Sequence, residues 1–145
     1  MSDHLILRVV AKLFIPFILL FALYVQFHGD FGPGGGFQAG VIFAAAFALH
    51  CLVFGIDRVR RAFPPRLVEF CAAFGVLLYI GTGVAGILLG GAFLDYNVLG
   101  SDPVKGQHLG ILLVELGVGI TVAAVMVALF YCFCGRSPEG RGREQ

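Results

Sequence analysis

The sequence predicts an all-α integral membrane protein with four transmembrane helices and both termini in the cytoplasm. Of its 145 residues, 59% are hydrophobic and 13% are charged, and the mean hydropathy is +0.92. A soluble domain has about 45–50% apolar and about 25% charged residues. Apolar residues also run on for about twenty positions in four places, which is the length that a helix needs to cross a bilayer core. Strands of a membrane barrel would instead alternate apolar and polar residues over about ten positions.

The spans and a short tail account for most of the chain. We expect one membrane domain at 1–134 and a polar cytoplasmic tail at 135–145. The first span could instead be a cleavable signal peptide, because a charged start precedes its apolar run. No small-x-small cleavage pattern follows Phe27, so we expect this segment to stay as a span. The four spans are expected at about 5–27, 36–55, 67–94 and 109–134.

Lysine and arginine are divided unequally between the two sides of these spans. Nine of the ten lie at the amino end, between the second and third spans, or in the tail. Only Lys105 lies in the other two connections. Lysine and arginine accumulate in the cytoplasmic loops of membrane proteins. We therefore expect the glycine-rich loop at 29–36 and the loop at 95–107 to face outward.

Charge, cysteine and histidine exclude or disfavour several functions. The formal charge of +1 gives no basic excess for binding nucleic acid, so the lipid bilayer is the expected surroundings. The four cysteines fall in the expected cytoplasmic half, where structural disulfides are rare, and we interpret them as small apolar residues. His50 and His108 are expected in opposite leaflets and cannot ligate one haem iron. A haem held by His28 and His108 would lie among the headgroups and is disfavoured. We therefore expect no cofactor.

Glu115 is the strongest candidate for a functional residue inside a span. An ionisable side chain within the bilayer is costly unless it is paired or hydrated. His108 lies seven residues earlier on nearly the same helical face, so the two side chains could hold a proton or a cation near an outer mouth. The alternative is that Glu115 bonds a polar group of a neighbouring helix and only fixes packing. We favour ion or proton handling.

Glycine is unusually frequent, with 21 residues, and it recurs at helical spacing. Small residues four positions apart let helices approach closely, either within this chain or against other subunits. The loop with sequence GPGGGF is a poor match to a phosphate-binding P-loop, because no Lys-Ser or Lys-Thr follows it. A tight turn that fixes how the second span starts is the simpler interpretation. The spaced small residues are Gly36, Gly40, Ala44 and Ala48, then Gly86 and Gly90, then Gly106 and Gly110.

Two stretches resemble one protein family. The run HGDFGPGGGFQAG at 28–40 resembles the Pro-Gly-Gly-Gly-Phe signature of the MnhB (also MrpB) family, and the stretch at 107–118 resembles the last helix of that family. The resemblance covers nearly the whole chain except the tail. Asp30 stands where many members carry histidine, and His108 stands where many carry aspartate. The loop and packing residues of the signature are Pro33, Gly34, Gly35, Gly36, Phe37 and Gly40.

The resemblance implies a function and a location. Members of the family are small membrane subunits of multisubunit cation/proton antiporters in the prokaryotic cell (inner) membrane, so the chain is expected to be a multi-pass transporter subunit and not an enzyme. Such a complex exchanges cytoplasmic Na⁺ for outside protons, and its other subunits are the expected partners. Na⁺ and H⁺ would be transported and no cofactor would be bound. Glu115, His108 and Asp30 are the candidate ion- or proton-handling residues.

Two other functions remain open from the sequence. The chain could be a purely structural or assembly subunit with no residue in an ion path. It could also be a self-sufficient small transporter or a redox membrane anchor, which we regard as the weaker alternative.

Overall fold

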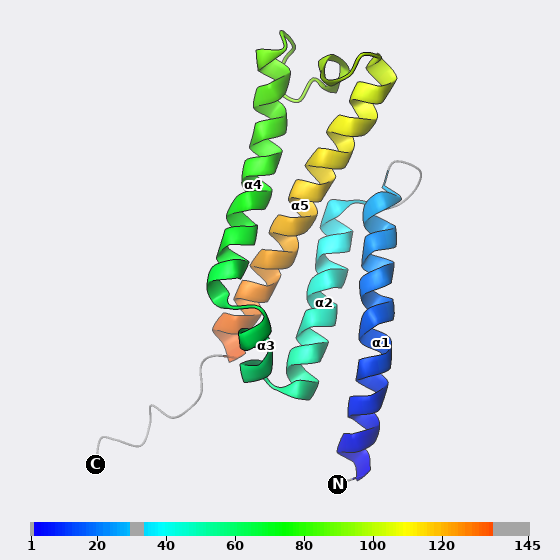
Figure 1. Ribbon diagram of the computed structural model, residues 1–145, viewed down its shortest axis with the longest axis vertical. Helices are drawn as coiled ribbons and strands as arrows, with labels where there is room; N and C mark the ends of the chain where they lie inside the picture. Colours follow the sequence, from blue (N-terminus) through cyan, green and yellow to red (C-terminus); the bar gives the residue numbers. More distant parts are fainter. Residues whose placement is uncertain (1, 30–33, 135–145) are drawn as a thin grey trace, which may run out of the picture.

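The computed structural model describes residues 2–29 and 34–134, and the regular elements in these ranges are all helical (Figure 1). Within the described part of the chain, four helices are long and apolar enough to cross a membrane. The predicted all-helical class with four spans is therefore confirmed. In chain order the elements are α1 (Ser2–Phe27), α2 (Gly36–Phe54), α3 (Ile56–Ala62), α4 (Pro65–Leu88), the 3₁₀ helix η1 (Tyr96–Leu99) and α5 (Pro103–Cys134).

The four long helices lie in a row in the order α4, α5, α2, α1. α5 packs against α4 on one side and α2 on the other, and α1 packs mainly against α2 (Figure 1). The chain therefore buries little of its apolar surface by itself: 11% of the most apolar stretch of α1 is buried, and no more than 28% in any other span. Lipid or partner helices must cover the remaining faces of the row.

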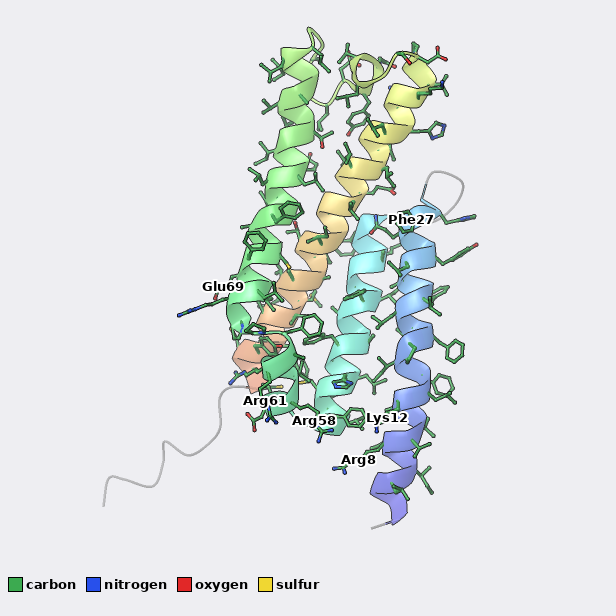
Figure 2. All side chains as sticks on the ribbon, in the orientation of Figure 1. Arg8, Lys12, Phe27, Arg58, Arg61 and Glu69 are labelled. Carbon is green, nitrogen blue, oxygen red and sulfur yellow. The ribbon has the colours of Figure 1, made fainter. Side chains whose placement is uncertain are left out.

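The two ends of the row differ in charge and in height. At one end, which we call the basic end, α1 begins, α5 ends and α3 lies between them, and the side chains of Arg8, Lys12, Arg58 and Arg61 gather there (Figure 2). At the other end, which we call the η1 end, α4, η1 and α5 extend well beyond the end of α1 and the start of α2 (Figure 1). The η1 end therefore has a step. The distribution of lysine and arginine predicts that the basic end faces the cytoplasm.

The third span is shorter than predicted. α4 ends at Leu88 and not near residue 94. Gly90 adopts a φ of +89°, a conformation that favours glycine, and the amide of Gly91 donates to the carbonyl of Gly86 at 3.0 Å. A glycine in this conformation just after the last turn commonly terminates a helix. Gly90 is therefore a helix terminator and not a packing residue.

The loop expected at 95–107 is also shorter and partly helical. η1 occupies four of its residues, and α5 begins at Pro103, six residues before the predicted start. Proline is favoured in the first turn of a helix because its missing amide would have no partner there. The carboxylate of Asp95 accepts a hydrogen bond from the amide of Asn97 at 3.2 Å and so caps η1.

The spaced small residues of α2 pack within the chain. A Cβ atom added at Gly36 would collide with the backbone carbonyl of Glu115. At Gly40 it would lie 2.7 Å from the carbonyl oxygen of Gly119. Glycine at both positions therefore lets the backbones of α2 and α5 approach closely, as small residues do between membrane helices.

The pair at the start of α5 also packs internally. Gly106 faces the carbonyl of Tyr96 and Gly110 faces the ring of the same residue, so neither has room for a side chain. These glycines let η1 cover the first turns of α5. Of the two uses that the spacing allowed, packing within the chain is the one that the structure assigns to these pairs.

Candidate functional site

The carboxylate of Glu115 lies against the connection between α1 and α2. Glu115 is twelve residues into α5, which is about 18 Å along the helix axis. A Cβ atom added at Gly29 would lie 2.5 Å from Oε2 and 2.6 Å from Oε1 of Glu115. One added at Gly35 would lie 3.3 Å from Oε1. The half-buried carboxylate therefore occupies space that two glycines leave open.

The start of α2 meets the same turns of α5. Gly36 faces the backbone of Glu115, and its contacts also reach the amide of Gly119 one turn further along. Gly35 precedes the helix with a φ of +141°, a backbone conformation that residues other than glycine rarely adopt. Among these consecutive glycines, Gly36 lets the backbones of α2 and α5 approach closely, and Gly35 adopts the backbone conformation that starts α2. Gly35 and Gly36 begin α2 in this way, whereas Gly32 and Pro33 of the predicted tight turn lie outside the described residues.

Two helix ends face this carboxylate. The last carbonyls of α1 and the first amides of α2 have no partners within their own helices. A helix N-terminus favours negative charge and a C-terminus favours cations. The carbonyl oxygen of Val25 would lie 3.0 Å from a Cβ atom at Gly34, so the two ends are close to each other. A carboxylate beside the ends of two helices can hold either a proton or a monovalent cation.

The histidines occupy different positions around the site. His108 is an exposed residue of α5, about 10 Å nearer to the η1 end than Glu115. His28 directly precedes Gly29, and its ring stacks on Tyr24 with 4.9 Å between the ring centroids. Sequence reasoning considered His28 only as a haem ligand, although its position beside the glycine loop places it near Glu115. The ring of His50 contacts that of Phe54 near the opposite end of α2, with the two planes tilted by 34°.

The other predicted site residues are placed as follows. Asp30 and Pro33 lie outside the described residues. Phe37 is 64% exposed on the first turn of α2, so its ring is available to lipid or to a partner. Gly40 lies against Gly119 of α5. Among the residues that the structure describes, no three His, Cys, Asp or Glu side chains are grouped so as to hold a metal ion.

Gln26 is a polar residue that the sequence analysis missed. Its side chain is 6% exposed, its Oε1 faces Gly119, and its Nε2 is buried without a hydrogen-bond partner in the described ranges. The signal was present, because Gln26 follows small Ala22 by four positions and so shares its face of the first span. A buried amide in an otherwise apolar span is costly and therefore needs an explanation.

Comparison with known proteins gives a consistent result. Residues 6–128 match a family model described as "Domain related to MnhB subunit of Na+/H+ antiporter". Two relatives from Staphylococcus aureus, strains Newman and JH1, are each 34% identical to this chain over 139 residues. The alignment covers 92% of this chain and 96% of each relative, and both relatives are named "Putative antiporter subunit mnhB2".

Proposed function

Since this chain belongs to the MnhB family, we propose that it is a membrane subunit of a multisubunit antiporter that exchanges Na⁺ for protons. The family model spans residues 6–128, which include all of α2, α3, α4 and η1 and most of α1 and α5. The open row of helices supports a role as one subunit among several, because two broad apolar faces need partners or lipid. The other antiporter subunits are the expected partners.

Within that complex, we propose that Glu115 binds a proton or a cation in competition. The observation that carries this proposal is the placement of its carboxylate against Gly29 and Gly35, where α1 ends and α2 begins. Transporters commonly bind ions where interrupted helices present their ends inside the membrane. Here the ends of two helices and a carboxylate of a third supply the same chemistry.

The step at the η1 end supports access to this carboxylate. Glu115 is about 18 Å along α5 from its start, and its carboxylate lies against Gly29, just beyond the end of α1. Backbone that is not helical is tolerated at membrane depth only where protein covers it or where it lines a water-filled cavity. We propose that the step forms one wall of an aqueous passage whose other wall is a partner subunit. His108 would line that passage between Glu115 and the η1 end.

Substitution of Glu115 tests this role against the structural alternative. Glu115→Gln keeps the size of the side chain and removes its charge, while Glu115→Ala removes both. We expect the complex to assemble with either variant and Na⁺-dependent antiport in everted membrane vesicles to fall by about tenfold or more, because a charged ligand is lost. Glu69→Gln is the control, since Glu69 is an exposed residue on α4.

A scaffold role predicts a different outcome. If both Glu115 variants assemble and retain the antiport rate of the wild type, the chain is a structural or assembly subunit without ion contact. A chain that extracts alone as a stable homo-oligomer with antiport activity, or that shows a haem absorption band, would overturn the subunit assignment itself.

A further inference from the structure

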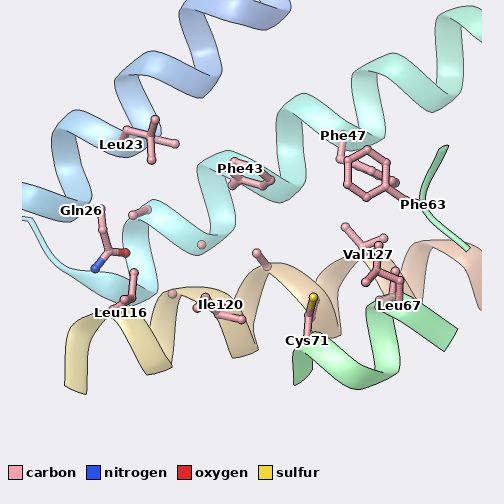
Figure 3. Close-up of a pocket in the computed structure, with 17 residues that line it drawn as sticks. Leu23, Gln26, Phe43, Phe47, Phe63, Leu67, Cys71, Leu116, Ile120 and Val127 are labelled. Atoms are coloured by element: carbon pink, nitrogen blue, oxygen red, sulfur yellow. The ribbon is translucent and has the colours of Figure 1, made fainter. Parts of the chain in front are cut away.

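A cavity of about 290 Å³ opens on one face of the row. It is bounded by α1, α2, α4, α5 and the turn before α4, and Figure 3 shows bulky side chains such as Phe43 and Leu67 around it. Small residues, among them Ala39, Gly40 and Ala123, leave the space between these larger groups. We call this cavity the Gln26 groove, after the polar residue at its end.

The groove needs an apolar occupant. Protein interiors are close-packed, and voids larger than a water molecule are few. Water is a poor filling, because a cavity with apolar walls stays dry even when it is large enough for several molecules. The walls here are apolar except at Gln26, so the groove is suited to hydrocarbon along nearly its whole length.

The one polar side chain lies at one end of the groove. Figure 3 shows Gln26 reaching from α1 towards α5 at that end. Its Nε2 lacks an acceptor within the described part of the chain, although only 6% of the residue is exposed. An amide can turn about its last bond to present either its oxygen or its NH₂ group. The occupant should therefore carry one hydrogen-bond acceptor at the Gln26 end.

The length of the groove matches one leaflet. Its lining on α5 runs from Leu116 to Val127, which is about 16 Å along the axis, or about half of a 30 Å bilayer core. Gln26 is the last residue but one of the apolar span Leu5–Phe27, so the groove begins where that span ends.

We propose that the Gln26 groove binds one acyl chain of a membrane phospholipid, with the ester carbonyl accepting a hydrogen bond from Gln26. The acyl chain supplies the apolar length and the ester supplies the single acceptor. The lipid would fill the gap between α1–α2 and α4–α5, and so join the two halves of an otherwise open row. This site is independent of Glu115 and of the proposed ion path.

Photolabelling of the assembled antiporter complex tests the site. Membranes would be loaded with phosphatidylcholine that carries a diazirine in the middle of one acyl chain, and labelled residues would be mapped by mass spectrometry. We expect label on the part of α5 around Ile120 and Ala123, and label on exposed Phe17 of α1 serves as the lipid-facing reference.

Two variants and a control define the outcomes. Ala123→Leu fills the groove and should lower its label about tenfold relative to Phe17, as expected for overpacking. Gln26→Met keeps the length of the side chain without the amide and should lower it about threefold, the loss expected for one hydrogen bond. Ala73→Leu, at an exposed position of α4 outside the groove, should leave it unchanged.

The opposite results would overturn the proposal. A wild-type groove without label, beside a labelled Phe17, would mean that a partner helix or nothing fills the cavity. Equal label in wild type and Gln26→Met would show that Gln26 does not donate a hydrogen bond to the lipid. If Ala123→Leu does not assemble, label on the wild-type groove decides whether an acyl chain binds, and the Gln26→Met comparison decides whether the hydrogen bond forms.

Discussion

At the scale of single residues, the central feature is the contact of the Glu115 carboxylate with Gly29 and Gly35. Gly29 and Gly35 leave the space that the Glu115 side chain fills, and Gly36 brings the backbone of α2 against the same residue. Gly29, Gly35 and Gly36 therefore let the end of α1 and the start of α2 lie beside this acid. Any side chain at Gly29 would compete with the carboxylate for the same volume.

Gly29→Ala is expected to impair transport without preventing assembly. The added methyl group would lie 2.5 Å from Oε2 of Glu115, and the carboxylate, as the end of a flexible side chain, must move away. Misplacement of a reacting group by about 1 Å can cost up to about a hundredfold in rate, and we expect antiport to fall about tenfold here. The rate in everted vesicles measures this.

Gly81→Ala is the matched control for Gly29→Ala. A Cβ atom at Gly81 would meet nothing within 4 Å in the described structure, so its variant should transport like the wild type. Equal antiport rates for the two variants would show that the contact between Gly29 and Glu115 does not affect transport.

Sequence reasoning could identify Glu115 but not what surrounds it. A lone acid in an apolar span is conspicuous, because charge is costly in a bilayer. Its contact with Gly29 joins residues 86 positions apart, and no local pattern encodes such a pairing. Gln26 shares a helical face with Ala22, but the extent of its burial depends on the approach of α5 and not on α1 alone.

At the scale of helices, glycine spacing predicted close packing but not its partners. Gly36 and Gly40 meet α5, and Gly106 and Gly110 meet Tyr96 of η1. The crossing of α4 and α5 was not predicted, because its two glycines, Gly75 and Gly117, belong to different helices and form no repeat along the chain. The end of α4 and the start of α5 differ from the predicted bounds because Gly90 terminates one helix and Pro103 begins the other. Hydropathy alone does not detect these signals.

Gly75→Ala should weaken the pairing of α4 with α5. A Cβ atom there would lie 2.6 Å from the carbonyl oxygen of Gly117 and 2.8 Å from the amide nitrogen of Thr121, and backbone atoms cannot turn aside as a side chain can. Overpacking of this kind costs about 1–3 kcal/mol. We expect less intact complex to survive heating in mild detergent, measured by size-exclusion chromatography.

The comparison with Gly81→Ala separates the effect of the α4–α5 contact at Gly75 from the effect of alanine within a helix. Both substitutions replace glycine by alanine within α4, so their effects on helix propensity are similar, and only Gly75 faces another backbone. If the two variants resist heat equally, the close approach of α4 and α5 does not limit stability.

At the scale of the whole molecule, the row of helices explains why the chain works within a complex. Its apolar faces are too extensive to be covered by its own helices, and the step at the η1 end leaves the Glu115 site beside a taller wall of α4 and α5 (Figure 1). The number of spans followed from hydropathy. Their arrangement as an open row did not, since a closed bundle would give the same four apolar segments.

The basic end is expected in the cytoplasm. In a variant without native cysteines, a cysteine introduced by Ser101→Cys near the η1 end should react with an impermeant maleimide in intact cells. One introduced by Arg58→Cys should react only after the membrane is permeabilised, because arginine-rich connections stay inside. Labelling in the reverse pattern would invert the topology and place the Glu115 step on the cytoplasmic side.

The most direct measurement of the central claim is carbodiimide labelling of Glu115 in the assembled complex. A hydrophobic carbodiimide reacts with protonated carboxyl groups within the membrane, and mass spectrometry quantifies the adduct on this residue. If Glu115 binds Na⁺ and H⁺ in competition, its labelling falls as Na⁺ replaces choline at constant pH and ionic strength. Equal labelling in Na⁺ and choline would contradict competition at this carboxylate.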